Sequence, residues 1–379
     1  MPLSKRNVPL DVLRGLSVLL VCGHHLQGRL PSGPLEGLAT FWHTQGGIGV
    51  DVFFVLSGFL VSGLLVEEYA RRGEVRIGRF LVRRGCKLYP AYFAFLAYLL
   101  LRPVANALWQ HGDWLGALGQ RAWELLPNAL FVQNYWWDEH ATPLHTWSLA
   151  VEEHFYLVIP FLLAWLLRRD RLWWMPLLWL AAEIGTIWLR QQPGPWFGPT
   201  HLHASELLAG VSLRCLWHLS PGVREHTRNA AWPLVVIGVA AHAVAATLAD
   251  HWLHVPLLEL ASMALVAGAI HIDRSRFVGP LRHFAFLPRS CAWVGFHSYS
   301  IYLWHVTGMR VVERWFLSTD DGVPSSSQWL LTALVACGGA VVLGVITARL
   351  VEYPVLRLRD RLWPAATANR PEPGPLPAK

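Results

Sequence analysis

The chain has 379 residues, of which 54% are hydrophobic and only 15% are charged, and its mean hydropathy is +0.34. A soluble domain carries about 25% charged residues. The composition therefore excludes a soluble domain and predicts a membrane protein. The net charge of +7 need not indicate nucleic-acid binding, since basic residues also set membrane orientation, and the five cysteines lack the spacing of a metal site or disulfide framework.

Ten long apolar segments predict an all-α, polytopic membrane protein with about ten transmembrane helices. The predicted spans are residues 8–27, 46–66, 88–108, 147–167, 172–190, 202–219, 231–249, 254–272, 291–309 and 328–350. Several contain proline or glycine, which transmembrane helices tolerate. We expect residues 1–363 to form one transmembrane domain and the Pro-rich residues 364–379 to be a disordered tail.

The distribution of lysine and arginine predicts the orientation of these spans. With a cytoplasmic N-terminus, about 26 of the 32 basic residues fall on the cytoplasmic side. The other six, on the outer side, are Arg29, Arg102, Arg121, Arg190, Arg310 and Arg314. This bias predicts that both termini are cytoplasmic and that the longest outer loop covers about residues 109–146.

The first span carries both an arginine and a histidine. Eleven residues separate Arg14 from His25, which at 100° per residue is three turns plus about 20°. Both side chains are therefore expected on one face of the helix, about 16 Å apart along its axis, while His24 points about 100° away. Ionisable side chains on a transmembrane helix are costly, so this pair indicates a functional site.

The ionisable residues within or beside the spans form two groups according to their expected depth in the membrane. Those expected in the outer half are His25, Asp51, Glu152, Glu153, His154, Glu206, Glu259 and His305. Cations gather on the inner side as Arg14, Arg79, Arg83, Arg84 and Lys87. This arrangement suits an anionic donor that docks from the cytoplasm and an acceptor that reacts near the outer face. A structural interpretation also exists: the cations can act as orientation signals, and the His and Glu side chains as interhelical hydrogen-bond partners.

Seven short motifs follow one another along the chain. They are Arg14 with His25, Gly47–Leu60 around Asp51, Arg83–Pro90 (RRGCKLYP), Trp147–Leu157 (WSLAVEEHFYL), Glu206–Gly210 (ELLAG), Ser298–His305 (SYSIYLWH) and Glu352–Pro354 (EYP). In this order they resemble the membrane-bound acyltransferase 3 family, which includes O-antigen and peptidoglycan O-acetylases, glucan succinyltransferases and macrolide acyltransferases. The resemblance covers essentially the whole chain short of its tail.

The resemblance implies an enzyme that transfers an acyl group from acyl-CoA to a hydroxyl, usually of a carbohydrate. It implies a multi-pass protein of the bacterial inner membrane, with acetyl-CoA as the default donor and no metal. It also implies that His25 is essential and Arg14 important. The family's Arg-x-x-Arg falls on Arg84 and Lys87, which we expect, with Arg83, to bind the CoA phosphates, although lysine cannot make a two-pronged contact.

We expect His25 to act as general base on the acceptor hydroxyl, with Asp51 or Glu152 holding its tautomer. A transient acyl-histidine is the alternative. Three roles stay open for Arg14: stabilising the thioester oxyanion, contacting CoA, or pairing with Asp11. The side chains expected to contact the acceptor are Trp147, Glu153, Tyr156, Glu206 and His305.

Two other classes of protein compete with this hypothesis. A transporter or flippase for a glycan or small molecule would use the ionisable residues as a proton relay, but the chain lacks the inverted repeats typical of transporters. A haem-binding quinol oxidoreductase would account for 18 histidines, but most of them lie in loops or at helix ends. The expected partners are therefore acyl-CoA, a glycan or other hydroxyl acceptor, and the lipid bilayer, but no nucleic acid.

Overall fold

Helices make up almost all of the structure, a computed structural model that describes residues 7–136, 144–192, 198–248, 251–272, 286–316 and 323–363. Within these ranges it contains no β-strand, which confirms the all-α prediction. The predicted tail at 364–379 lies outside the described residues. The α-helices are α1 (Val8–His24), α2 (Glu36–Gln45), α3 (Ile48–Arg72), α4 (Ile77–Trp109), α5 (Trp114–Ala129), α6 (Trp147–Arg168), α7 (Trp174–Arg190), α8 (Ala204–Leu219), α9 (Pro221–Asn229), α10 (Ala231–Ala246), α11 (His254–His271), α13 (Phe286–Phe296), α14 (Ser298–Phe316), α15 (Ser326–Thr347) and α16 (Tyr353–Leu362). Short helices of other types are η2 (Leu144–Thr146), η3 (Thr200–Leu202) and the π-helical η5 (Ala348–Glu352).

Helix covers most of each predicted span, but the helices differ in their capacity to cross a bilayer. Five stretches among the described residues are long and apolar enough: α3, α4, α6, α11 and the continuous Ser326–Leu362. A sixth results if α9 and α10, which meet at a 77° bend, form one span. The helices α1, α7 and α8 have 17, 17 and 16 residues, about 25 Å each, slightly less than the ~30 Å hydrocarbon core. These stretches support a membrane protein; the count of ten and the orientation of the termini stay predictions.

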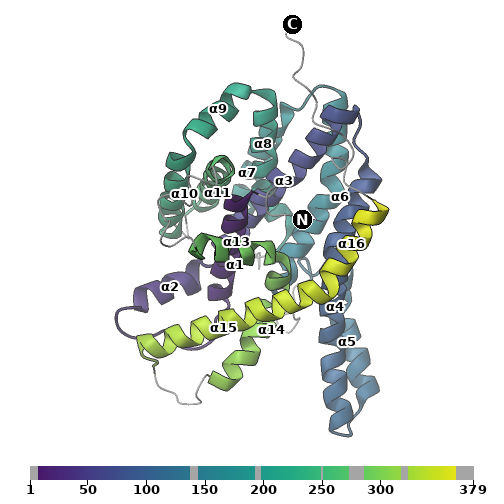
Figure 1. The fold of residues 1–379 in the computed structure, drawn as a ribbon, viewed down its shortest axis with the longest axis vertical. Coiled ribbons are helices and arrows are strands. Elements are labelled where there is room, and N and C mark those ends of the chain that lie inside the picture. Colours follow the sequence, from purple (N-terminus) through teal and green to yellow (C-terminus); the bar gives the residue numbers. More distant parts are fainter. Residues whose placement is uncertain are drawn as a thin grey trace.

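The region predicted as the longest outer loop contains a helix. α5 begins after Asp113, whose side chain accepts a hydrogen bond of 2.8 Å from the Gly116 backbone N–H and so caps the helix. α5 packs against the preceding α4. The two helices form a hairpin that extends beyond the rest of the bundle (Figure 1).

Two other helices depart from their predicted boundaries. α4 begins at Ile77 rather than near residue 88, because Ile77 and Phe80 pack on the apolar core and extend the helix towards its N-terminus. The span predicted at 291–309 is divided at His297 into α13 and α14. The cations that precede the third predicted span therefore lie on helix α4 and not in a loop.

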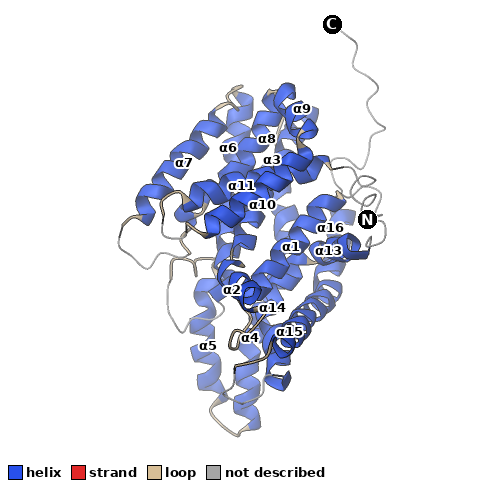
Figure 2. Cartoon of the chain, turned by 90° about the vertical axis from the view of Figure 1, so that its left-hand side faces the viewer, coloured by secondary structure: helices blue, strands red, loops and turns tan. Residues whose placement is uncertain are grey.

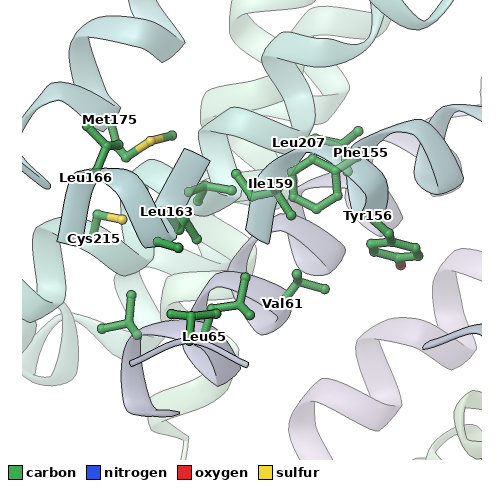
Figure 3. Packing of buried hydrophobic residues seen from close by; sticks show 14 of the residues in the cluster. Val61, Leu65, Phe155, Tyr156, Ile159, Leu163, Leu166, Met175, Leu207 and Cys215 are labelled. Carbon is green, nitrogen blue, oxygen red and sulfur yellow. The ribbon is translucent and has the colours of Figure 1, made fainter. Parts of the chain in front are cut away.

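The core around α3 depends on close contact with α6 and α8, and α7 packs against α8. Gly58 of α3 and Gly210 of α8 face the backbone of the opposite helix, where a Cβ atom would collide with the carbonyl oxygens of Leu207 and Val55. Small residues allow this approach of two membrane helices. Buried aliphatic side chains fill the remaining space, and Figure 3 shows Tyr156 at the edge of this cluster, with its hydroxyl directed away from it.

Helix α1 runs through the middle of the bundle (Figure 2). It packs against α3, α13 and α14, and α13 approaches it so closely that Gly15 and Gly295 lie at the contact. This central position brings side chains from the whole length of the chain against the two ends of α1.

Candidate active site

Two cavities lie against the two ends of α1. The first, which we call the Arg14 cavity, has a volume of about 470 Å³, and its lining includes Arg14, Ser57, Arg84, Lys87, Glu152 and Tyr156. The second, the His25 cavity, has a volume of about 400 Å³, and its lining includes His25, Arg102, Arg121, His145, Arg310 and Arg314. The two side chains predicted to share one face of the first helix therefore line different cavities.

The hydrogen bonds of His25 fix which of its nitrogens carries a proton. Its Nδ1 lies 3.0 Å from the Val21 carbonyl oxygen and 3.3 Å from Nε2 of His305. Because a carbonyl oxygen can only accept, Nδ1 of His25 is the donor. His305 likewise donates from its own Nδ1 to the Tyr302 carbonyl oxygen, so its Nε2 is an acceptor. Neutral His25 therefore keeps an unprotonated Nε2, as a general base or a nucleophile requires.

A third imidazole, that of His145, completes a cluster around His25. The ring of His145 lies 4.9 Å from that of His305 and 6.3 Å from that of His25, measured between centroids. Its Nε2 donates to the Leu303 carbonyl oxygen at 3.1 Å, and burial lowers the pKa of His145 to about 3, so the ring is neutral. No group of three His, Cys, Asp or Glu side chains among the described residues is placed to hold a metal ion.

The sequence analysis did not select His145, and only weak signals were available. It lies two residues before the Trp147–Leu157 motif, in the segment predicted as an outer loop. His305 was selected, and the structure places it against His25 although 280 residues separate the two.

Neither carboxylate expected to orient His25 lies beside it. Glu152 lines the Arg14 cavity, where its carboxylate accepts a hydrogen bond from the Ser57 hydroxyl. Asp51 interacts electrostatically with Glu206 and Arg190 instead. The orienting groups of His25 are thus a backbone carbonyl and a second imidazole, because α3 and α6 direct both carboxylates to other parts of the bundle.

The Arg14 cavity contains three of the predicted cations, and two of them are paired. Arg14 forms an ion pair of 2.9 Å with Asp11, the pairing that the sequence left open. Lys87 forms an ion pair with Glu352, whose other oxygen accepts a hydrogen bond of 2.7 Å from Ser300. This contact joins three of the seven motifs, which lie far apart in the sequence.

Arg84 is the third cation of this cavity and forms no ion pair with any described residue. Its guanidinium lies over the rings of Tyr156 and Phe80, 5.2 and 5.6 Å from their centroids. The adjacent Arg83 does not line the cavity; it bonds to Asp360 at 3.2 Å and to the Trp363 carbonyl oxygen. The structure therefore separates Arg83 from Arg84 and Lys87.

The residues expected to contact the acceptor are dispersed. The ring of Trp147 packs against that of His203 at a tilt of 37°, with 4.6 Å between centroids, and Glu206 lies within 3.2 Å of the same histidine. Glu153 accepts a hydrogen bond from Tyr89, and Tyr156 lines the Arg14 cavity. Of the five, only His305 contacts His25.

A hydrogen-bonded wall separates the two cavities. The Tyr302 hydroxyl donates to the His145 carbonyl oxygen at 2.8 Å and accepts from the Ser148 hydroxyl at 2.6 Å. Tyr302 and Ser148 line the Arg14 cavity, and His145 lines the His25 cavity. The side chain of Tyr302 therefore lies between the Arg14 cavity and the imidazoles of His25, His145 and His305.

Comparison with known proteins gives the family. The acyltransferase domain family known as acyltransferase 3 matches residues 7–349. The chain belongs to this family. It is 27% identical over 386 residues to the O-acetyltransferase OatA of Staphylococcus aureus strain NCTC 8325, an alignment that covers 93% of this chain and 58% of OatA. It is 25% identical over 382 residues to the peptidoglycan O-acetyltransferase OatA of Listeria monocytogenes, covering 93% of this chain and 56% of that protein.

The acyltransferase 3 chain thus spans little more than half the length of these curated relatives. No solved structure is significantly similar to it. The match to the family confirms the resemblance drawn from the seven motifs.

Proposed function

We propose that this chain is a membrane-embedded O-acyltransferase that moves an acyl group, acetyl by default, from cytoplasmic acyl-CoA to a hydroxyl of a carbohydrate. Family membership and the names of the relatives support the acyltransferase class. The observation that carries the proposal is the placement of α1 between two cavities. At its C-terminal end His25, with an unprotonated Nε2, lines the His25 cavity, and nearer its N-terminus Arg14 lines the Arg14 cavity.

The acyl donor would occupy the Arg14 cavity. Acyl-CoA combines several phosphates with a long apolar arm, and this cavity combines three cations with the rings of Phe53, Phe54 and Tyr299. Arg84 is best suited to the phosphates because it forms no ion pair with a described residue and interacts with Glu152 only at longer range, whereas Arg14 and Lys87 are each paired with a carboxylate. The predicted orientation, with a cytoplasmic N-terminus, would bring the donor to this cavity from the cytoplasm.

The acceptor would bind in the His25 cavity. His25 Nε2 would take the proton of the acceptor hydroxyl while the oxygen attacks the thioester carbonyl carbon. The carbon–sulfur bond then breaks, the ester remains on the acceptor, and the proton passes to the CoA thiolate. In the alternative route Nε2 itself attacks the thioester carbonyl carbon, the carbon–sulfur bond breaks, and CoA thiolate leaves an acyl-histidine. The acceptor hydroxyl then attacks this acyl group, the bond from carbon to Nε2 breaks, and the hydroxyl proton passes to the thiolate. The same unprotonated nitrogen serves both routes.

Arg14 fits a donor-binding role better than stabilisation of an oxyanion at His25. Eleven residues of helix place the two positions about 16 Å apart along the axis. One carbonyl group cannot lie beside both side chains. The thioester must instead travel past Tyr302 to reach His25, so we propose that the Tyr302 ring moves during the cycle.

The decisive test is the O-acetyl content of surface glycans in cells that express the protein, measured by mass spectrometry. Wild type should add O-acetyl groups, and His25→Ala should abolish them because the base or acyl carrier is lost. His24→Ala is the matched control, because His24 is the next residue along the chain but lines neither of the two cavities. The imidazole of His24 bonds instead to the His43 carbonyl oxygen. Normal acetylation by a correctly inserted His25→Ala protein would exclude this mechanism.

A second measurement separates the enzyme from the transporter hypothesis. Purified protein in detergent should release free CoA from acetyl-CoA when a hydroxyl acceptor is present. A transporter has no membrane to work across in detergent and would leave the thioester intact.

A further inference from the structure

The His25 cavity is strongly basic, and this property extends the proposed function to the class of acceptor. Four arginines line the cavity: Arg102, Arg121, Arg310 and Arg314. They come from three helices, since α4 carries the first, α5 the second and α14 the last two. Six arginines were predicted on the outer side of the membrane, so four of those six meet at one cavity beside the candidate base.

In the part of the chain that the structure describes, few carboxylates offset these charges. Arg121 is paired with Glu124 at 2.7 Å. Arg102, Arg310 and Arg314 are exposed and form no ion pair or hydrogen bond within the described ranges. The nearest acid on α14 is Glu313, whose carboxylate is buried and accepts from the Gln27 backbone N–H at 3.1 Å. Within the described ranges, the cavity therefore carries a concentration of positive charge, which Glu124 and Glu313, the latter through its electrostatic interaction with Arg310, offset only in part.

Such a concentration is unfavourable unless an anion compensates for it. Arg310 and Arg314 are four residues apart on one helix, where like charges repel each other. A cavity lined by one sign of charge attracts ligands of the opposite sign and raises their local concentration. Guanidinium groups in addition form two-pronged hydrogen bonds with carboxylate and phosphate groups.

We infer that the acceptor is an anionic carbohydrate, with a carboxylate or phosphate group bound by Arg102, Arg310 and Arg314 while its hydroxyl faces His25. Phe95 and Tyr98, which line the same cavity, supply aromatic surface for the sugar ring. This inference rests on the proposed function. It assigns the three arginines to acceptor binding, apart from the donor cations of the Arg14 cavity.

The test uses the purified protein in discs of phosphatidylcholine, a lipid without net charge, with acetyl-CoA as donor. The acceptors are a disaccharide containing glucuronic acid, the methyl ester of the same disaccharide, and a phosphorylated disaccharide. Wild type should acetylate at least one of the two anionic acceptors with a kcat/KM about ten- to hundredfold above that for the ester. The two anionic acceptors distinguish a carboxylate-binding from a phosphate-binding site.

Substitution of individual arginines tests whether they cause the preference for an anionic acceptor. Arg310→Gln and Arg314→Gln should each raise the KM for the anionic acceptor about tenfold and leave the KM for acetyl-CoA unchanged. Arg29→Gln is the control, because Arg29 is exposed, shares the predicted outer side and does not line the cavity. Added salt should weaken acetylation of the anionic acceptor more than that of the ester.

The outcomes separate the inference from the proposed function. Equal rates with anionic and neutral acceptors, or variants that behave like Arg29→Gln, would overturn the inference while the enzyme stays an acyltransferase. A charge effect that arises only when phosphatidylglycerol is added to the discs would also overturn it, because the arginines would then bind lipid headgroups. Failure to consume acetyl-CoA in these assays, together with unmodified glycans in the cell assay above, would contradict the proposed function.

Discussion

The imidazole of His25 is oriented by neighbours that carry no charge. Catalytic histidines in hydrolytic triads are held by a carboxylate, which also stabilises the imidazolium. Here the Val21 carbonyl oxygen and Nε2 of His305 lie at Nδ1 of His25 in place of such a carboxylate. His305 could also share a positive charge formed on His25, because its Nε2 is an acceptor directed at Nδ1 of His25. We therefore regard His305 as a positioning residue.

Replacing His305 tests this role at the scale of one side chain. His305→Phe should lower kcat about tenfold or more, because Nδ1 of His25 loses an acceptor, and should leave the KM for acyl-CoA unchanged. His305→Gln keeps an acceptor oxygen and should retain more of the activity. Steady-state kinetics of purified protein measures both effects. If Phe and Gln variants lose the same share of kcat, His305 contributes packing alone.

Helix α4 shows how register selects among neighbouring cations. Successive residues of a helix point about 100° apart, so Arg83 and Arg84 cannot share a surface. Arg84 lines the Arg14 cavity, whereas Arg83 bonds to Asp360 and to the Trp363 carbonyl oxygen of the last described turn. One arginine thus faces the proposed donor site, and the other joins α4 to α16.

The two arginines should therefore differ in kinetic effect. Arg84→Ala should raise the KM for acyl-CoA about ten- to hundredfold and change the KM for the acceptor little, because it removes the unpaired guanidinium of the cavity. Arg83→Ala should leave both KM values near wild type and act on stability alone. Steady-state kinetics with each substrate varied in turn gives the KM for acyl-CoA and the KM for the acceptor in each of the two variants. A larger effect of Arg84→Ala on the acceptor would place the donor elsewhere.

At the scale of the whole molecule, the two-sided arrangement requires α4 to cross the membrane. α4 is 33 residues long and connects a turn rich in basic residues, which includes Arg72 and Arg76, to the α4–α5 turn at Gln110. Basic residues favour the cytoplasmic side. Donor and acceptor cavities would then open to opposite faces of the membrane.

Cysteine labelling in intact cells tests this orientation. After Cys86 and Cys291, the two native cysteines that are not buried, are replaced by alanine, Gln110→Cys should react with a membrane-impermeant maleimide. Glu74→Cys, in the α3–α4 turn, should react only after the membrane is permeabilised. Reaction of both positions from the same side would show that α4 does not cross.

Much of the fold followed from local sequence. Long apolar runs predicted helix over all ten spans, because removal of apolar side chains from water depends on composition and length. The misplaced boundaries arose where an apolar run is interrupted: α5 contains two glycines, a proline and four polar residues, and the first turns of α4 contain several cations. Such segments are helical because one face packs on a neighbour, which the local sequence does not reveal.

By itself, the sequence determined the all-α class, the membrane setting and the family, because these depend on composition, periodicity and motif order. The tertiary structure alone decided what surrounds His25. It brought His305 and His145 to its ring, kept Asp51 and Glu152 away, and gathered four arginines at one cavity. Those neighbours come from helices far apart in the chain, and only the packing of these helices, with glycines at their closest contacts, determines which side chains meet.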